Sequence, residues 1–264
     1  MDQIEKRLFL IRALLKENPE YGNLEIPPEG ASQKRLLRSL FNVRMPALKD
    51  PDFLKVQDDY LSEIAAEKGI VRLCDIPVVR NSMSIWQGDI TRLEVDAIVN
   101  AANSQMLGCF VPMHSCIDNC IHTYAGIQLR EECSRKMDKL REKYGPDYEQ
   151  PTAIPMLTDA YNLPARKVIH IVGPIVMGRL TESLEKDLAD CYTNTLDMCL
   201  ENNLRSVAFC CISTGVFSFP NYRAAEIATS TVGSWLKTHE GAVEQVVFNV
   251  FKDEDRRFYE ALLS

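Results

Sequence analysis

Two cysteines and a histidine lie close together in a stretch of the chain that has no charged side chain. Cys109, His114 and Cys116 fall within eight residues of one another, inside the charge-free segment 97–117. Thiolate and imidazole are the ligands that zinc selects in proteins. Three ligands leave a fourth position open for water or substrate, as in catalytic zinc sites. The sequence therefore predicts one zinc ion per chain, bound by these residues.

Two nearby residues, Cys120 and His122, are reserve ligands on the helix expected after this segment. If either bound the metal, the coordination sphere would be closed and the zinc would be structural. The spacing does not fit the zinc deaminases, whose pattern is His-x-Glu followed by Pro-Cys-x-x-Cys. Nine cysteines in a chain that starts without a secretion signal favour reduced thiols or a metal over a disulfide framework.

A second stretch, residues 213–220, has the residue types of a phosphate site. It begins with Ser213-Thr214-Gly215 and joins an apolar run to a helical pattern. Hydroxyl side chains and backbone N–H groups beside a helix N-terminus bind phosphate without a basic side chain. The same kind of turn also joins strands to helices in proteins that bind no phosphate, so a purely structural turn is the alternative.

The overall charge restricts the partners. The chain has 30 Lys and Arg against 37 Asp and Glu, which gives a net charge of −7 at pH 7. Nucleic acids and anionic lipids are held by a positive field, so neither is expected as a partner. No stretch has the pattern of a membrane helix and the first residues have no signal-peptide pattern, so we expect a cytoplasmic protein.

The spacing of apolar residues divides the chain into two parts. Up to about residue 70 they recur at helical spacing, and from about residue 80 short apolar runs alternate with helical stretches. The expected strands include 97–100, 167–172, 206–212 and 245–251, and the expected helices 118–143, 182–202, 221–238 and 254–263. This alternation predicts an α/β layered domain over residues 76–264, preceded by an N-terminal helical extension over residues 1–75.

Five short motifs, taken in their order and spacing, resemble the macrodomain family. They are Gly88-Asp89-Ile90-Thr91, Ile98-Val99-Asn100-Ala101-Ala102-Asn103-Ser104, Cys120-Ile121-His122 with Ala125-Gly126, His170-Ile171-Val172-Gly173-Pro174, and Ile212-Ser213-Thr214-Gly215-Val216-Phe217. The resemblance covers about residues 80–264. It implies a three-layer α/β/α fold with a mixed central sheet and a cleft that binds ADP-ribose.

One departure from the family pattern indicates a branch of it. Hydrolases of the family usually carry a glycine-rich run after a Leu-Gly pair, and here residues 109–116 replace that run. This resembles the zinc-dependent microbial macrodomains, which also carry a helical N-terminal extension. The resemblance implies a hydrolase that removes ADP-ribose from mono-ADP-ribosylated proteins. Some members are encoded beside a sirtuin-type ADP-ribosyltransferase and a lipoyl-carrier protein, which makes such a carrier a candidate substrate.

The resemblance also implies roles for residues along the ADP-ribose molecule. Asp89 is expected to accept a hydrogen bond from the adenine amino group with Ile90 beside it, and Phe251 to lie near the base or its ribose. The diphosphate is expected to be held by Ser213, Thr214, Gly215, Val216 and Phe217. Ser218 stands where many relatives have glycine, which leaves open how many amides reach the diphosphate. For Asp89 alone, a turn residue is the alternative.

At the other end of the ligand, Asn100 and Asn103 are expected to face the distal ribose, where Asn103 orients a hydroxyl. Asp118 occupies the position of the catalytic carboxylate in the related hydrolases that lack zinc. An acidic residue in the first turn of a helix is also stabilised by the helix dipole, and Asp118 could have both roles. We therefore expect Asp118 and Asn103 to be the catalytic residues.

The reaction that the resemblance implies is hydrolysis of the bond between C1″ of the distal ribose and a protein side-chain oxygen, with a carboxylate ester favoured. Zinc could polarise the ribose or the ester carbonyl, or could lower the pKa of a bound water from 15.7 to about 7. A non-catalytic ADP-ribose-binding module is the main alternative, and it would need neither Asp118 nor a metal. A structural zinc beside a degenerate cleft is another, and it would need a fourth protein ligand.

Overall fold

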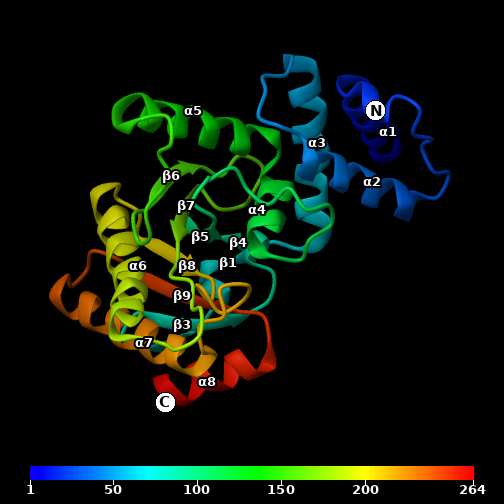
Figure 1. Cartoon of the computed structure of the whole chain (residues 1–264). Helices are drawn as coiled ribbons and strands as arrows, with labels where there is room; N and C mark the ends of the chain where they lie inside the picture. Colours follow the sequence, from blue (N-terminus) through cyan, green and yellow to red (C-terminus); the bar gives the residue numbers. More distant parts are fainter.

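A mixed sheet of seven strands forms the centre of the computed structural model, which describes residues 1–264 (Figure 1). In spatial order the strands are β2 (Val78–Arg80), β3 (Met83–Gln87), β9 (Gln245–Val250), β8 (Ser206–Phe209), β5 (Ala97–Ala102), β7 (Lys167–Val172) and β6 (Met156–Asp159). The five inner strands run parallel and the two edge strands antiparallel to their neighbours. Parallel strands end at the same edge of a sheet, so the loops after β3, β5, β7, β8 and β9 gather at one edge.

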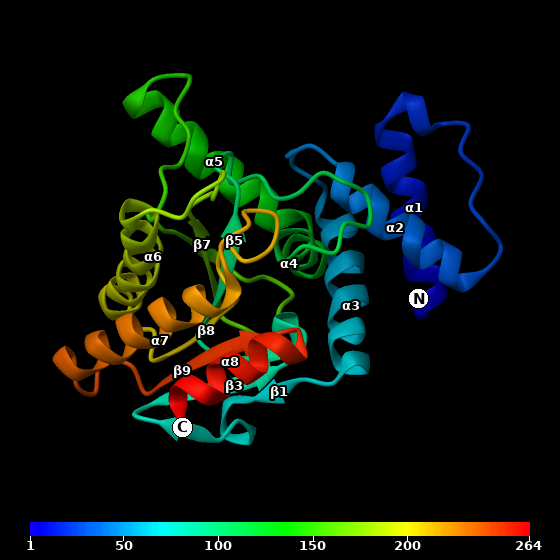
Figure 2. The same ribbon diagram turned by 60° about the horizontal axis from the view of Figure 1, so that its bottom comes forward.

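Helices cover both faces of this sheet (Figure 2). One layer contains α6 (Glu182–Glu201), α7 (Asn221–Thr238) and α8 (Asp253–Leu263), and the other contains α4 (Ile117–Ala125) and α5 (Ile127–Tyr144). The predicted three-layer α/β/α class with a mixed sheet is confirmed. None of the helices combines the length and the apolar character that a membrane span requires.

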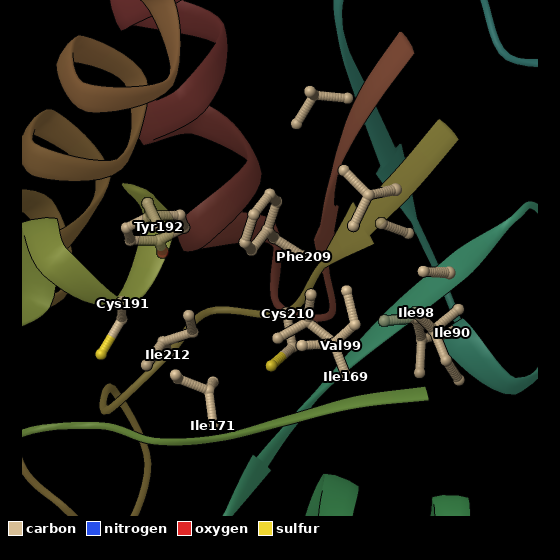
Figure 3. Close-up of a cluster of buried hydrophobic side chains, with 14 of the residues drawn as sticks. Ile90, Ile98, Val99, Ile169, Ile171, Cys191, Tyr192, Phe209, Cys210 and Ile212 are labelled. Carbon is tan, nitrogen blue, oxygen red and sulfur yellow. The ribbon is translucent and has the colours of Figure 1, made fainter. Parts of the chain in front are cut away.

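The inner strands are mostly apolar because both of their faces are covered. Every residue of β8 and β9 is buried, and all of β5 is buried except Ala101. On the α6 side, the ring of Tyr192 packs against Phe209 of β8 with 4.9 Å between the ring centroids. Figure 3 shows these two rings in one cluster with apolar side chains of β5 and β7.

Three helices precede the sheet: α1 (Gln3–Glu17), α2 (Gly30–Val43) and α3 (Pro51–Lys68). Asp2 caps α1, and its carboxylate accepts hydrogen bonds from the backbone N–H groups of Ile4 and Glu5. The three helices bury a small apolar cluster that is separate from the main core and includes one residue of α5, Ile127. They lie on the α4 side of the molecule (Figure 1). The short strands β1 (Val71–Arg72) and β4 (Leu93–Glu94) pair with each other after them.

The helix predicted over residues 118–143 is wrong in one respect, because it is two helices separated at Gly126. This glycine has a φ of 94°, which ends α4 and begins α5. A Cβ at position 126 would lie 2.6 Å from Nε2 of Gln57 on α3. The close approach of α3 therefore requires a residue without a side chain here.

Candidate active site

The cysteine loop, residues 103–116 between β5 and α4, brings the three predicted metal ligands together. The ligand atoms of Cys109, His114 and Cys116 all lie within 4.8 Å of one another, and Sγ of Cys109 is 3.6 Å from Nδ1 of His114. Cys120 and His122 lie outside this group. Two thiols and one imidazole in a partly buried loop are a donor set that fits zinc with one coordination position open.

Cys116 has two functions in this arrangement. It is the N-cap of α4, where its Sγ accepts a hydrogen bond of 3.4 Å from the backbone N–H of Asn119. Burial raises the pKa of the Cys116 thiol to about 12. A bound cation would reverse that shift because the thiolate is the ligand form.

The conformation of the cysteine loop depends on a turn made by Asn103. Its Oδ1 accepts a hydrogen bond from the backbone N–H of Gln105 at 3.1 Å, and its Nδ2 donates to the carbonyl of Gly108 at 3.2 Å. Gly108 has a φ of 80°, and a Cβ there would lie 2.8 Å from the ring of His122. The loop is therefore packed closely on α4 at this point.

Asp118 lies in the first turn of α4, two residues after Cys116, and its side chain is buried. Oδ1 of Asp118 accepts a hydrogen bond of 2.8 Å from Nδ2 of Asn100. Burial raises the pKa of Asp118 to about 6, although the hydrogen bond from Asn100 acts in the opposite direction. A buried carboxyl with a pKa near neutrality can accept and release a proton during a reaction.

A buried chain of hydrogen bonds continues behind Asp118. Nδ2 of Asn100 also lies 3.0 Å from Nδ1 of His170, and Nε2 of His170 lies 3.0 Å from Oγ1 of Thr158. Because an amide nitrogen only donates, Nδ1 of His170 is the acceptor and its proton is on Nε2. Burial lowers the pKa of His170 to about 3, so the ring is neutral. Asn100 thus lies beneath Asp118, and its contact with the distal ribose stays a prediction.

His170 also belongs to a second, fully buried group of metal-ligand types, together with His122 and Cys133. Both ring nitrogens of His170 are already hydrogen-bonded to Asn100 and Thr158. This group therefore fits a support for Asp118 better than a metal site.

Asp89 lies at the other end of the sheet edge, directly after β3. One oxygen of its carboxylate accepts hydrogen bonds from the backbone and the hydroxyl of Thr91, and the other lies 2.8 Å from Nζ of Lys68 at the end of α3. Burial alone would raise the pKa of Asp89, but the hydrogen bonds from Lys68 and Thr91 hold it below its usual value. Asp89 is therefore an ionised acceptor. Ile90 beside it is buried, and Phe251 after β9 is 78% exposed.

The serine loop, residues 213–220 between β8 and α7, presents unused hydrogen-bond donors. The backbone N–H groups of Gly215, Val216 and Phe217 donate to no acceptor in the protein, and the buried hydroxyl of Ser213 has no partner. The loop is closed by its own backbone, with Phe219 N–H donating to the carbonyl of Ser213 at 3.0 Å. Consecutive free N–H groups beside a helix N-terminus form an anion site.

The predicted residues thus lie at one edge of the sheet. Most of them are in the loops after β3, β5, β8 and β9, while Asn100 is on β5 and Asp118 is in the first turn of α4. The structure also adds two roles that the sequence did not indicate, for Lys68 beside Asp89 and for His170 behind Asn100. Lys68 had no recognisable signal because it ends an amphipathic helix. His170 stands in one of the five family motifs, but its position inside an apolar strand gave no indication of what it contacts. Their proximity follows only from the packing of α3 and from the register of β5 and β7.

The sequence is similar to that of a known family and of named hydrolases. Residues 99–228 match the family model described as Macro domain. The chain is 48% identical to a protein-ADP-ribose hydrolase of Treponema medium over the full length of both proteins. It is 42% identical to a protein-ADP-ribose hydrolase of Staphylococcus aureus strain Mu50, with 97% of this chain and 94% of the relative aligned.

Solved structures agree with this similarity. The Trypanosoma brucei macrodomain in complex with ADP-ribose superposes with a TM-score of 0.66 at 28% identity, covering 86% of this chain and 95% of the other. The Oceanobacillus iheyensis macrodomain with ADP superposes with a TM-score of 0.59 at 34% identity. That comparison covers 69% of this chain and 89% of the other.

Proposed function

This chain belongs to the macrodomain family, and we propose that it is a zinc-dependent hydrolase that removes ADP-ribose from mono-ADP-ribosylated proteins. The observation that carries this proposal is the position of Asp118, in the first turn of the helix that Cys116 caps. This position puts a buried carboxyl next to the two thiols and the imidazole that fit zinc. All of these groups lie at the edge of the sheet where the serine loop has free backbone N–H groups. The names of the two similar hydrolases support the same activity.

ADP-ribose would be bound without any basic side chain at the diphosphate. The ionised carboxylate of Asp89 accepts from the adenine amino group, and the free N–H groups of Gly215, Val216 and Phe217 donate to phosphate oxygens. This arrangement explains how a chain with a net charge of −7 can hold a ligand with two negative charges. The cysteine loop would then lie beside the distal ribose, at the other end of the ligand from the adenine.

Cys109, His114 and Cys116 would hold the zinc ion. When bound, zinc supplies a Lewis acid for an oxygen of the ribose or the ester and lowers the pKa of water. The carboxylate of Asp118, beside these ligands, accepts a proton, and Asn100 fixes one of its oxygens by the 2.8 Å hydrogen bond. The neutral ring of His170 keeps the Asn100 amide oriented toward Asp118.

The nature of the leaving group follows from the acids available. Glycosidases that expel a poor leaving group use two carboxyls, one of which protonates it. Asp118 is the one buried carboxyl in the α4 turn beside the metal ligands. A carboxylate leaves without protonation because its conjugate acid has a pKa of about 4. The proposed bond is therefore the ester between C1″ of the distal ribose and an Asp or Glu side chain of the substrate.

The zinc requirement is tested with a protein carrying ester-linked ADP-ribose, and a modified lipoyl-carrier protein is the first substrate to try. Wild type should release ADP-ribose, while chelated protein and Cys116→Ser should lose the activity and keep their affinity for free ADP-ribose. Cys74→Ser is the matched control because Cys74 is exposed. Elemental analysis accompanies each assay. A metal-free protein that cleaves at the wild-type rate would disprove the zinc mechanism.

The linkage is tested separately. The same acceptor peptide is prepared with ADP-ribose on glutamate, on serine or on arginine, and release is measured with equal enzyme. Only the glutamate ester should be cleaved at a useful rate. Comparable release from serine or arginine would require an acid that protonates the leaving group, and the ester assignment would be wrong.

A further inference from the structure

The second helix of the N-terminal extension contacts the cysteine loop through two polar side chains. We propose that Arg38 and Asn42 of α2 are positioning residues of the metal site, which hold the cysteine loop in the conformation that brings its three ligands together. This inference rests on the proposed function in that it takes residues 109, 114 and 116 as the metal ligands. It assigns the extension a role in metal binding in addition to packing.

Arg38 connects α2 to both ends of the metal site. One of its terminal nitrogens, Nη2, donates to the backbone carbonyl of His114 at 2.8 Å and to Oδ1 of Asn119 at 2.9 Å. Asn119 is fully buried on α4, and its own Nδ2 donates to the carbonyls of Cys109 at 3.3 Å and Val111 at 3.0 Å. A single guanidinium thus restrains the backbone at His114 directly and at Cys109 through Asn119.

Asn42 lies one helical turn after Arg38 and is 1% exposed. Its Oδ1 accepts a hydrogen bond of 3.0 Å from the backbone N–H of Met113, and its Nδ2 donates to Oγ1 of Thr123 on α4 at 2.9 Å. Met113 has a φ of 59°, in the left-handed region that is unfavourable for a residue with a side chain. Asn42 therefore stabilises a strained residue directly before the ligand His114.

A third contact fixes the C-terminal end of α2 against the start of the same loop. Nη1 of Arg130 on α5 donates to the carbonyls of Phe41 at 3.0 Å and Asn42 at 2.9 Å, while Nε of Arg130 donates to the carbonyl of Leu107 at 2.7 Å. The guanidinium also lies 4.3 Å from the centre of the Phe110 ring. Helix α2 and the cysteine loop are thus joined on both sides of Cys109.

These contacts matter because the cysteine loop contains no helix or strand between Asn103 and Cys116. A loop that had to be ordered by the metal would lose conformational entropy on binding for each residue that becomes fixed. A loop that is already held loses less, and the metal binds more tightly. Residues that orient the ligands of a metal from outside its coordination sphere typically change affinity by about 10- to 100-fold.

The test is zinc affinity, measured by competition with a chromophoric chelator on the full chain. Arg38→Met keeps the length of the side chain and removes its donors, and we expect it to weaken zinc binding by about 10- to 100-fold. Arg35→Met is the matched control, because Arg35 is exposed on the same helix and makes no hydrogen bond or ion pair. Arg38→Lys, which keeps one donor group, should give an intermediate affinity.

Two further measurements separate positioning from a general loss of structure. The visible absorption of the cobalt-substituted protein reports the geometry of a thiolate site, and it should change in Arg38→Met but not in Arg35→Met. The affinity for free ADP-ribose, measured by calorimetry, should stay within about twofold in both variants because the serine loop and Asp89 do not contact α2.

The outcomes distinguish this proposal from the proposed function. Wild-type zinc affinity and an unchanged cobalt spectrum in Arg38→Met would overturn the role of α2 and leave the hydrolase intact. Wild-type protein that binds zinc but cleaves no substrate would overturn the hydrolase, while the affinity comparison would still decide the role of α2. Wild-type protein that binds no zinc would overturn both.

Discussion

The cysteine loop and the serine loop leave the same edge of the sheet, but they are held in different ways. The cysteine loop is fixed by side chains of three helices, among them Arg38 of α2, Asn119 of α4 and Arg130 of α5. The serine loop is closed by bonds between its own backbone groups, such as Ser218 N–H to the carbonyl of Gly215 at 3.1 Å. The cysteine loop is a product of tertiary packing. The serine loop is mainly a local turn, with one hydrogen bond from outside, from Val176 N–H to the carbonyl of Phe217 at 2.9 Å.

This difference fits the two ligands that the loops are proposed to bind. A metal ion needs three side chains at fixed mutual distances, so errors of a few tenths of an ångström matter. A diphosphate accepts hydrogen bonds from several amides over a larger volume, and a short turn beside a helix N-terminus is sufficient. The two loops should therefore respond to substitution independently of each other.

A pair of glycine substitutions should give the largest effects and the sharpest test of this independence. Gly108→Ala places a Cβ 2.8 Å from the His122 ring at a φ of 80°, and should reduce hydrolysis at least about 100-fold. Gly173→Ala places a Cβ 2.1 Å from Oγ of Ser213, and should weaken ADP-ribose binding about 10- to 100-fold.

Each variant of this pair is measured for zinc content, ADP-ribose affinity by calorimetry, and hydrolysis. Gly108→Ala should lose zinc but bind ADP-ribose, and Gly173→Ala should show the reverse. Gly233→Ala is the control, because a Cβ there meets only Met83 at an ordinary 3.6 Å. If each glycine variant lost both properties while remaining folded, the two loops would be one cooperative unit and the comparison would fail.

Asp118 provides the next largest effect, measured as the stability of the metal-free protein. Its pKa in the folded protein is raised to about 6 from an ordinary 3.8, so the unfolded state is the more ionised one and folding is penalised as pH rises. The penalty develops between about pH 4 and pH 6 and reaches at most about 3 kcal/mol above that range. Asp118→Asn should thus stabilise the chelated protein by about 1–3 kcal/mol at pH 8 and by little at pH 4.

Denaturant unfolding at the two pH values tests this. Asp147→Asn is the control, since Asp147 is exposed and makes no ion pair. The Asn100 hydrogen bond can persist in Asp118→Asn because the new side chain also offers an oxygen. Equal stability of wild type and Asp118→Asn at pH 8 would show that Asp118 is ionised at no cost, and that it is not the proton acceptor with a raised pKa.

The two loops also show what a sequence can and cannot predict. The grouping of Cys109, His114 and Cys116 was predictable because residues at most seven positions apart stay close in a compact loop. The serine loop was predictable because a turn from strand to helix is local. The residues that support the site were not predictable, because Arg38, Asn42 and Lys68 reach it only through the packing of α2 and α3.

The same reasoning applies to the sheet. The inner strands β5, β7, β8 and β9 were recognisable as mainly apolar runs. The inner strand β3 is mixed in character, and the edge strands β2 and β6 are short, and these three were not among the predicted strands. The break at Gly126 also escaped prediction, since it depends on Gln57 from a distant helix. Asn100 shows that the role of a single residue is harder to predict. In a strand that is buried on both faces, the sequence does not indicate which side chains face a ligand.

Asp89 tests recognition at the adenine end with a smaller effect. Asp89→Ala removes the acceptor proposed for the adenine amino group and should weaken ADP-ribose binding by about 1–3 kcal/mol. Zinc content should not change, because Asp89 follows β3 and contacts α3 rather than the cysteine loop. Lys68→Met is the control that removes the partner of Asp89 but keeps the acceptor, and it should have the smaller effect. Unchanged affinity of Asp89→Ala in calorimetry would remove Asp89 from the adenine site.

The smallest expected effect is at Ser218, and it tests whether the serine loop is a self-sufficient turn. Ser218 has a φ of 57°, and its exposed hydroxyl makes only a long contact of 3.5 Å with the carbonyl of Val216. Glycine adopts this φ without strain but has more freedom in the unfolded chain, and the two contributions nearly cancel. Ser218→Gly should therefore change the free energy of unfolding by less than about 0.5 kcal/mol and ADP-ribose affinity by less than about twofold.

The matched control for Ser218 is Ser230→Gly, in the exposed interior of α7. There the backbone is helical, and the hydroxyl donates to the carbonyl of Ile227 at 3.1 Å. Ser230→Gly therefore loses this bond as well as helix propensity, and should destabilise the protein by about 0.5 kcal/mol or more. A smaller loss of stability in Ser218→Gly than in Ser230→Gly is the result expected from the left-handed conformation and the weak hydroxyl contact at position 218. If Ser218→Gly instead weakened ADP-ribose binding tenfold without a change in stability, the serine side chain would itself hold the amides in place. The serine loop would then depend on a side chain, as the cysteine loop does.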